Sequence, residues 1–344
     1  MIQERHQFAL ELERRDKSPL GQFPVTMDWE PARQWARLAA LRAGQQPGLE
    51  ASIEPRWEAT VGKPYVDGIC VRLADVSVVI PTTYFRTAAQ QIAQTLVAEK
   101  RLTDGELFNY GVVAFPIQKE TPRPLFRIEE VTAALPLKPA RLPSGVEFGT
   151  QYPEDLPVLV PQAVLDEATA MTRQAEANEI GAILIGHVCR DDERRDLFIE
   201  VTALIPARHA LSESAKLTFT AETWTAVDAA IKLRRRNEQM LGWFHSHPAK
   251  YWCSANCSLE ARKKCPLSRN FFSAEDCLLH RTVFPMAHCS ALVVTNTDAG
   301  LKYAMFGWRH GIIAQRGFHI LNATDTVGEP AEALIGGNHE EVCT

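Results

Sequence analysis

Apolar residues recur at helical or strand spacing in two groups, which are separated by a proline-rich stretch. Segments of the first group alternate or run apolar like strands, or repeat at the spacing of an amphipathic helix. They predict helices at 31–43 and 87–100, and strand regions at 68–81 and 110–118. Residues 1–28 are polar and charged, and they predict either an ordered arm or a loose lead-in.

The second group predicts a sheet with helices on its faces. Its helices are expected at 161–178 and 221–236, and its strands at 179–188, 196–206, 240–248, 289–296 and 301–308. Six prolines lie from Pro136 to Pro161, and because proline disfavours helix, this stretch predicts an extended linker. The class is therefore α/β (α+β), with a smaller α+β domain at 1–150, a larger domain at 151–325 and a tail at 326–344.

Composition and charge narrow the functional classes. The 344 residues carry 42 acidic and 37 basic side chains, and this mild negative balance gives no reason to expect nucleic-acid binding. No apolar run approaches the roughly 18 residues that span a bilayer. The charged segment 1–17 also lacks the apolar stretch of a secretory signal. We therefore expect a soluble, cytoplasmic protein that binds neither membranes nor nucleic acid.

Five of the eight cysteines lie within 37 positions, and such clustering without an export signal favours metal binding over disulfides. Three of them fall in residues 249–272, a segment with no clear secondary structure. Their thiolates can close on a structural zinc with a fourth ligand from further along the chain. The set is Cys253, Cys257 and Cys265, with Cys277, Cys289, His280 or His288 as the fourth. The alternative is a flexible loop with unpaired thiols.

The motif His245-Ser246-His247-Pro248 ends an apolar strand. Alternate residues of a strand point to the same face, so His245 and His247 project together. Two imidazoles on one face are two corners of a tetrahedral zinc site. Taken alone, two histidines near a strand end can equally be ordinary core or surface residues.

Two carboxylates complete the pattern. Asp276, in Ser273-Ala274-Glu275-Asp276, can be a third zinc ligand that leaves the fourth position to water. Alternatively, Ser273 and Asp276 form a helix capping box. Glu179 opens a buried strand, and it can take a proton from such a water and deliver it to a leaving amine, or it can simply be solvated. Glu275 is the second candidate for this proton transfer.

Together these motifs resemble the JAMM family, the MPN-plus or JAB-type zinc metalloproteases that include proteasome-lid and endosomal deubiquitinases. The family pattern is a Glu on an early strand, then His-x-His-Pro, then Ser-x-x-Asp at a helix start. The resemblance implies a JAB1/MPN-type mixed sheet flanked by helices. It also implies a catalytic zinc held by His245, His247 and Asp276, with Glu179 as general acid/base and Ser273 as a donor to the oxyanion.

The resemblance further implies a zinc isopeptidase that cleaves after the extended tail of a ubiquitin-like modifier. The order of domains is similar to proteins that accompany bacterial ubiquitin-like conjugation systems, which implies activating or conjugating enzymes as further partners. Two alternatives are a processing peptidase for a ubiquitin-like or sulfur-carrier precursor, and a non-catalytic MPN scaffold. Residues 249–272 are longer than the corresponding segment of typical members, and no motif assigns a role to residues 1–150.

Overall fold

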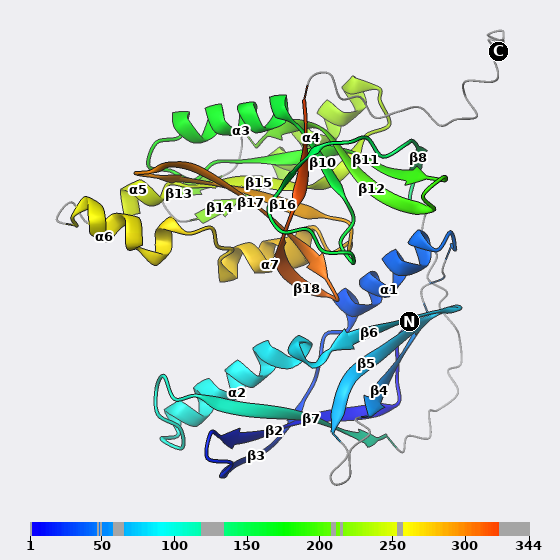
Figure 1. Ribbon diagram of the computed structural model, residues 1–344, viewed down its shortest axis with the longest axis vertical. Coiled ribbons are helices and arrows are strands. Elements are labelled where there is room, and N and C mark those ends of the chain that lie inside the picture. The colour runs from blue at the N-terminus through cyan, green and yellow to red at the C-terminus, as the bar shows by residue number, and fades with distance from the viewer. Residues whose placement is uncertain are drawn as a thin grey trace. The chain divides into compact units, whose positions relative to one another are not determined.

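Figure 1 shows the computed structural model, which describes residues 2–46, 48, 50–57, 65–117, 134–207, 211–213, 216–252 and 257–322. The chain divides into two compact units, one formed by residues up to Ala134 with His310–Ile312, the other by the remaining residues from Leu135 onward. No helix within these described ranges is long and apolar enough to cross a membrane.

The first unit is a sheet covered by helices. Its helices are α1 (Glu30–Arg42) and α2 (Arg86–Ala98), with a 3-10 turn at Thr82–Phe85. Seven strands in its described part are β1 (Ile2–Glu4), β2 (His6–Arg14), β3 (Pro19–Val25), β4 (Ala51–Trp57), β5 (Val66–Leu73), β6 (Val76–Pro81) and β7 (Phe108–Pro116). Their order is β1-β4-β5-β7-β2-β3, and β6 pairs with β5.

Residues 1–28 are part of this sheet, because β1, β2 and β3 fall within them. In β2, Phe8, Leu10 and Leu12 recur with a period of two and are at most 3% exposed. Between them, the buried Ala9 and the half-buried Glu11 occupy the other face of the strand. Of the two alternatives for this segment, the loose lead-in is wrong: the segment is ordered, and it forms strands of the sheet. The charged residues among its apolar ones obscured this alternation in the sequence.

The second unit contains a mixed sheet. Its ten strands among the described residues are β8 (Leu137–Pro139), β9 (Val146–Phe148), β10 (Val158–Pro161), β11 (Gly181–Asp191), β12 (Asp196–Pro206), β15 (Gln239–His247), β16 (Ser290–Thr297), β17 (Gly300–Arg309), β18 (Ile312–Arg316) and β19 (Phe318–Leu321). The order is β18-β17-β16-β15-β11-β12-β10-β19-β9, with β8 beside β11. β15 runs antiparallel to β11 and parallel to β16, so the predicted mixed sheet is confirmed.

The proline-rich stretch is extended, as predicted, but it belongs to this sheet. β8 pairs with β11, and β9 pairs with β19. Pro139 is the last residue of β8, and Pro161 is the last residue of β10. At the end of a strand, the missing amide proton of proline does not interrupt the hydrogen bonds between neighbouring strands. The division between the units therefore falls before this stretch, whereas the sequence placed it near residue 150.

Helices flank the second sheet, and Figure 1 shows α3 and α7 on opposite sides of it. The helices of this unit are α3 (Gln162–Gln174), α4 (Ala221–Arg234), α5 (Ala249–Trp252), α6 (Leu259–Lys264) and α7 (Ala274–Val283). A small hairpin is formed by β13 (Leu211–Glu213) and β14 (Lys216–Thr218). α5, α6 and a 3-10 turn at Pro266–Ser268 lie in residues 249–272, where the sequence predicted no clear structure. Each is too short to show an apolar period, although Ser258 caps α6 by accepting from the amide of Ala261.

The strand β15 lies in the core. One core cluster joins Trp243 of β15 to Ile183 of β11 and Val227 of α4, all at most 1% exposed. Every residue from Leu241 to His247 is buried. A strand covered on both faces and paired on both edges has little freedom to move, so the side chains at its end are held in fixed positions.

A β-bulge in β15 depends on Gly242. Leu184 of β11 pairs with Gly242, whereas Ile185 pairs with Met240, so Leu241 is the extra residue. Gly242 has a φ of +147°, and a Cβ at this position would overlap the carbonyl oxygen of Ser290 in β16. Only glycine allows this close approach of two backbones, three residues before the first histidine of the motif.

We expect Gly242→Ala to lower the free energy of unfolding by about 3 kcal/mol or more, because strained φ and overlap with β16 act together. Gly300→Ala is the matched control, since Gly300 has a φ of +112° with no atom within 4 Å of its Cβ position. It should lose only about 1 kcal/mol. Denaturant unfolding measures both variants, and equal losses would show that close packing at Gly242 has no effect of its own.

Candidate metal centre

The two motif histidines end β15. In the sheet register, His245 lies opposite Gly181 of β11 and Val293 of β16. His245 and His247 are 0% and 1% exposed, and their Nε2 atoms are 3.0 Å apart. The predicted projection from one face is therefore observed, and the two ring nitrogens converge on one point.

Asp276 approaches the same point from the first turn of α7. Its Oδ1 lies 3.4 Å from Nε2 of His245, and its Oδ2 lies 3.6 Å from Nε2 of His247. The capping box is also present: Ser273 Oγ accepts from the amide of Asp276, and Asp276 Oδ2 accepts from the amide of Ser273. The capping-box and ligand interpretations of Asp276 are thus compatible.

The donor set fits a zinc ion. The ligating atoms of His245, His247 and Asp276 all lie within 4.8 Å of one another, and this is the one such group among the described residues. Ligands about 2.0–2.1 Å from a tetrahedral metal lie about 3.3 Å apart, close to the distances seen here. Two imidazoles and a carboxylate leave the fourth position to water, which is typical of catalytic zinc sites.

Charge in the group is balanced internally. Burial opposes ionisation of Asp276, but the charge of His245 and the hydrogen bonds from both histidines hold the pKa of this carboxyl well below its usual range. Burial lowers the pKa of His247, although Asp276 partly opposes this shift. An ionised Asp276 carboxylate and a neutral His247 imidazole are protonation states that bind a metal.

Aromatic side chains hold the two imidazoles. Trp243 stacks on His245 at 4.3 Å between ring centroids, and Phe271 stacks on His247 at 4.5 Å. Trp243 Nε1 donates to Nδ1 of His280, 3.1 Å away in α7. Burial lowers the pKa of His280 to about 3, so this imidazole is neutral and can accept the bond.

Sequence reasoning missed these supports. Trp243 lies two residues before His245 on the same face of β15, and this spacing could have predicted that the two side chains are neighbours. No spacing rule identifies Phe271, because it comes from the long segment that follows β15. His280 was expected as a possible ligand of a structural zinc, whereas in the structure it is bonded to Trp243.

Glu179 is buried beside the histidines. The amide of Ser246 donates to the carbonyl oxygen of Ile180, and the amide of Ile180 donates to the Ser246 hydroxyl oxygen. Gly181 pairs with His245, so continuing this register beyond the start of β11 puts Glu179 opposite His247. Glu179 is 6% exposed, and the solvated alternative is therefore wrong. Burial raises the pKa of Glu179 to about 7; His245 opposes this shift, and Asp276 and Glu275 add to it. Glu275 itself is exposed.

The cysteine-rich segment is described in part. Cys257 is exposed, while Cys265 and Cys277 are half-buried. Cys289 is packed in the core, where burial raises the pKa of its thiol to about 12. Within the described ranges none of these thiols, nor His280 or His288, joins a group of three ligands. Cys253 lies outside the described residues, so the structural zinc stays a prediction.

Comparisons with known proteins relate part of the chain to one family. Residues 161–251 match the family model of prokaryotic homologs of the JAB domain, which confirms the resemblance to the JAB/MPN-type family. The match includes Glu179, His245 and His247 and ends before Ser273 and Asp276. No curated protein matches the chain. Protein DSY2949 from Desulfitobacterium hafniense, in a solution structure, aligns over 51% of this chain and 96% of its own, with 22% identity and a TM-score of 0.33.

We expect His247→Ala to weaken zinc binding by at least about a hundredfold, because it removes one of three ligands. Zinc should raise the Tm of the unchanged protein but not of the variant. His187→Ala is the control, since His187 is a half-buried histidine of β11 outside the group. Metal titration and thermal unfolding measure the effect, and undiminished zinc affinity in His247→Ala would contradict the assignment.

The cysteine segment has its own test. If its thiolates hold a structural zinc beside the catalytic one, elemental analysis of the purified protein should give near two zinc ions per chain, and Cys257→Ser near one. Cys70→Ser, in the first unit, should leave the ratio unchanged. A ratio near one in every protein would show that the segment binds no metal.

Proposed function

We propose that this protein is a zinc-dependent isopeptidase that hydrolyses the amide bond after the C-terminal tail of a ubiquitin-like modifier. The observation that carries the proposal is the convergence of two histidine nitrogens and a carboxylate beside a buried glutamate. A scaffold has no need of such a group, because burying ionisable side chains together is costly without a function. The family match supports the same class of protein.

The roles of the residues follow from their positions. His245, His247 and Asp276 would hold the zinc, which when bound supplies an activated water at neutral pH. Glu179 accepts the proton of this water on a carboxylate oxygen and then donates it to the departing nitrogen. Burial raises the pKa of Glu179 to about 7, and a cation held by the neighbouring ligands would lower it and so favour the ionised carboxylate that accepts a proton.

Ser273 supports the charge that develops on the carbonyl oxygen. The Ser273 Oγ accepts a hydrogen bond from the amide of Asp276, and this bond fixes the position of the Oγ atom. The hydroxyl proton of Ser273 is then available to donate to the carbonyl oxygen of the substrate. Donation to an oxygen that gains charge lowers the barrier by about 3 kcal/mol in typical hydrolases. The capping interaction therefore orients the Ser273 hydroxyl at the helix start.

The shape of the region favours a narrow substrate segment. Phe271 and Trp252 lie against His247, with ring centroids 4.5 and 5.4 Å away, and they limit the space near the metal ligands. A tail ending in Gly-Gly has no side chains and fits such a space. β15 is paired on both sides, so the tail cannot pair with this strand and must bind to other elements.

We expect Glu179→Gln to retain zinc and lose turnover by about a hundredfold or more, because it keeps the size of the side chain but removes the base. Glu275→Gln is the matched control, since Glu275 is exposed one residue from a metal ligand. It should cleave at nearly the original rate. Normal turnover in Glu179→Gln together with a loss in Glu275→Gln would move the role to Glu275.

The reaction itself is tested by offering the protein two substrates in parallel. One is a ubiquitin-like protein joined through its tail to a lysine side chain, and the other is the same protein as a linear fusion. Preference for the first supports the isopeptidase, and preference for the second supports the processing peptidase. Cleavage of neither by the zinc-loaded protein would favour a scaffold.

A further inference from the structure

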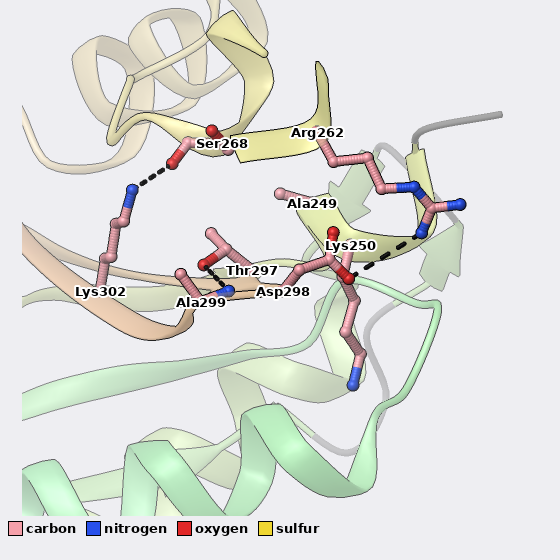
Figure 2. A pocket seen from close by; sticks show the side chains of 8 residues that line it. All are labelled: Ala249, Lys250, Arg262, Ser268, Thr297, Asp298, Ala299 and Lys302. Carbon is pink, nitrogen blue, oxygen red and sulfur yellow. Dashed lines mark hydrogen bonds and ion pairs between the residues drawn. The ribbon is translucent and has the colours of Figure 1, made fainter. Parts of the chain in front are cut away.

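The two motif histidines are supported by different parts of the second unit. Phe271, which stacks on His247, is half-buried and belongs to the segment between β15 and α7. Figure 2 shows one anchor of this segment, where Lys302 of β17 donates to the carbonyl oxygen of Ser268 at 2.8 Å. The support of His245 comes instead from fully buried residues of β15 and α7.

Trp243 supports His245 by stacking on it. The two ring centroids are 4.3 Å apart, and the ring planes differ by 17°. The rings of Phe272 and Phe284 pack around the indole, with centroids 5.9 and 6.5 Å from that of Trp243. Because the imidazole lies flat against a ring that is itself packed in the core, the direction of its Nε2 atom depends on the orientation of the indole.

A buried hydrogen bond joins this indole to α7. Trp243 Nε1 donates to Nδ1 of His280 at 3.1 Å, and the two residues are 1% and 0% exposed. An indole nitrogen can only donate, so Nδ1 of His280 is the unprotonated nitrogen. Nε2 of His280 forms no hydrogen bond within the described part of the chain. Among those residues, Trp243 is therefore the hydrogen-bond partner of the His280 side chain.

This bond lies next to the metal ligands on both elements. His280 follows Asp276 by four residues, so the two side chains share a face of α7 and are about 6 Å apart along the helix. Trp243 and His245 share a face of β15, two residues apart. The strand and the helix thus meet at two neighbouring points, one at the ligands and one at the hydrogen bond. The second point is a bond between protein side chains and needs no metal.

Another indole joins α7 to the sheet further from the ligands. Trp308 Nε1 of β17 donates to the carbonyl oxygen of Phe284, which directly follows α7, at 2.9 Å. Phe284 is eight residues after Asp276, or about 12 Å along the helix. Apolar contacts are not directional, whereas a hydrogen bond fixes both a distance and an angle. Of the two indole bonds, the one from Trp243 is closer to the carboxylate ligand.

We propose that Trp243 and His280 are positioning residues of the metal centre. The hydrogen bond between them holds the end of β15 and the start of α7 at the separation that a zinc ion needs. Trp243 acts on His245 through the stacked rings, and His280 acts on Asp276 through one turn of helix. The inference rests on the zinc-dependent function proposed above and adds two residues to those on which it depends.

Zinc affinity and stability are measured on the same set of variants. Trp243→Phe keeps a ring beside His245 and removes the donor, whereas His280→Leu removes the acceptor. The side-chain oxygen of Asn lies near the position of Nδ1 in His, so His280→Asn keeps an acceptor. Metal titration measures zinc affinity, and denaturant unfolding without zinc measures stability. The visible absorption of cobalt bound in place of zinc reports the geometry of the ligands.

Trp308→Phe is the matched control. It removes the other indole hydrogen bond of α7, and Trp308 also packs against the ring of His280, with centroids 5.5 Å apart. It therefore controls for a lost hydrogen bond and for disturbed packing at His280. Should His280→Leu fail to fold, Trp243→Phe and Trp308→Phe still give the comparison.

We expect Trp243→Phe and His280→Leu each to weaken zinc binding about tenfold. The protein with both changes should also lose about tenfold and not a hundredfold, because the two changes remove the same bond. His280→Asn and Trp308→Phe should bind zinc within about threefold of the unchanged protein. Trp308→Phe should lose stability but leave the cobalt absorption unchanged, whereas Trp243→Phe should alter this absorption.

The outcomes separate the two proposals. Equal zinc affinity in all variants would overturn the inference, because the bond would then serve the fold alone. Losses that multiply in the double variant, or a loss in Trp308→Phe as large as in Trp243→Phe, would overturn it as well. Absence of zinc binding in the unchanged protein would overturn both proposals. Zinc affinity that depends on the bond, in a protein that cleaves neither conjugate nor fusion, would support the positioning residues and count against the peptidase.

Discussion

The candidate metal site depends on the carboxylate of Asp276, which interacts with both α7 and the end of β15. Asp276 closes the first turn of α7 by accepting from the amide of Ser273, and it also faces the imidazoles at the end of β15. The start of a helix carries partial positive charge from its unpaired amides, which favours an anion there. The same carboxylate faces both buried imidazoles, so one side chain positions the start of α7 and completes the set of metal-binding atoms.

The sheet supplies the complementary constraint. β15 is paired along both edges and covered on both faces, and its bulge at Gly242 fixes the register before the histidines begin. The end of β15 is fixed in position, and the start of α7 is capped by Asp276, which is itself a candidate metal ligand. Together they hold the donor atoms close to one another before any metal binds. Such preorganisation lowers the cost of assembling a site with correct geometry.

Much of this could be predicted from the sequence, because the motif and the elements that carry it obey local rules. The alternation His-x-His and the capping pattern Ser-x-x-Asp each fix a side-chain direction within a few residues. Elements whose signal is not local were missed: β2 hides its apolar face among charges, and Phe271 reaches His247 from a long insertion. The burial of Glu179 depends on neighbouring strands, which no single segment reveals.

Residues 249–272 begin directly after Pro248 and end at Ser273, so both of their ends are anchored by the residues that place the metal ligands. The entropy of closing a loop rises only slowly with its length. Insertions between these anchors therefore need not disturb the ligands, provided that Trp252 and Phe271 keep their contacts with His247. The group of His245, His247 and Asp276 can therefore keep its geometry while the parts of this segment that do not contact His247 change in length and composition.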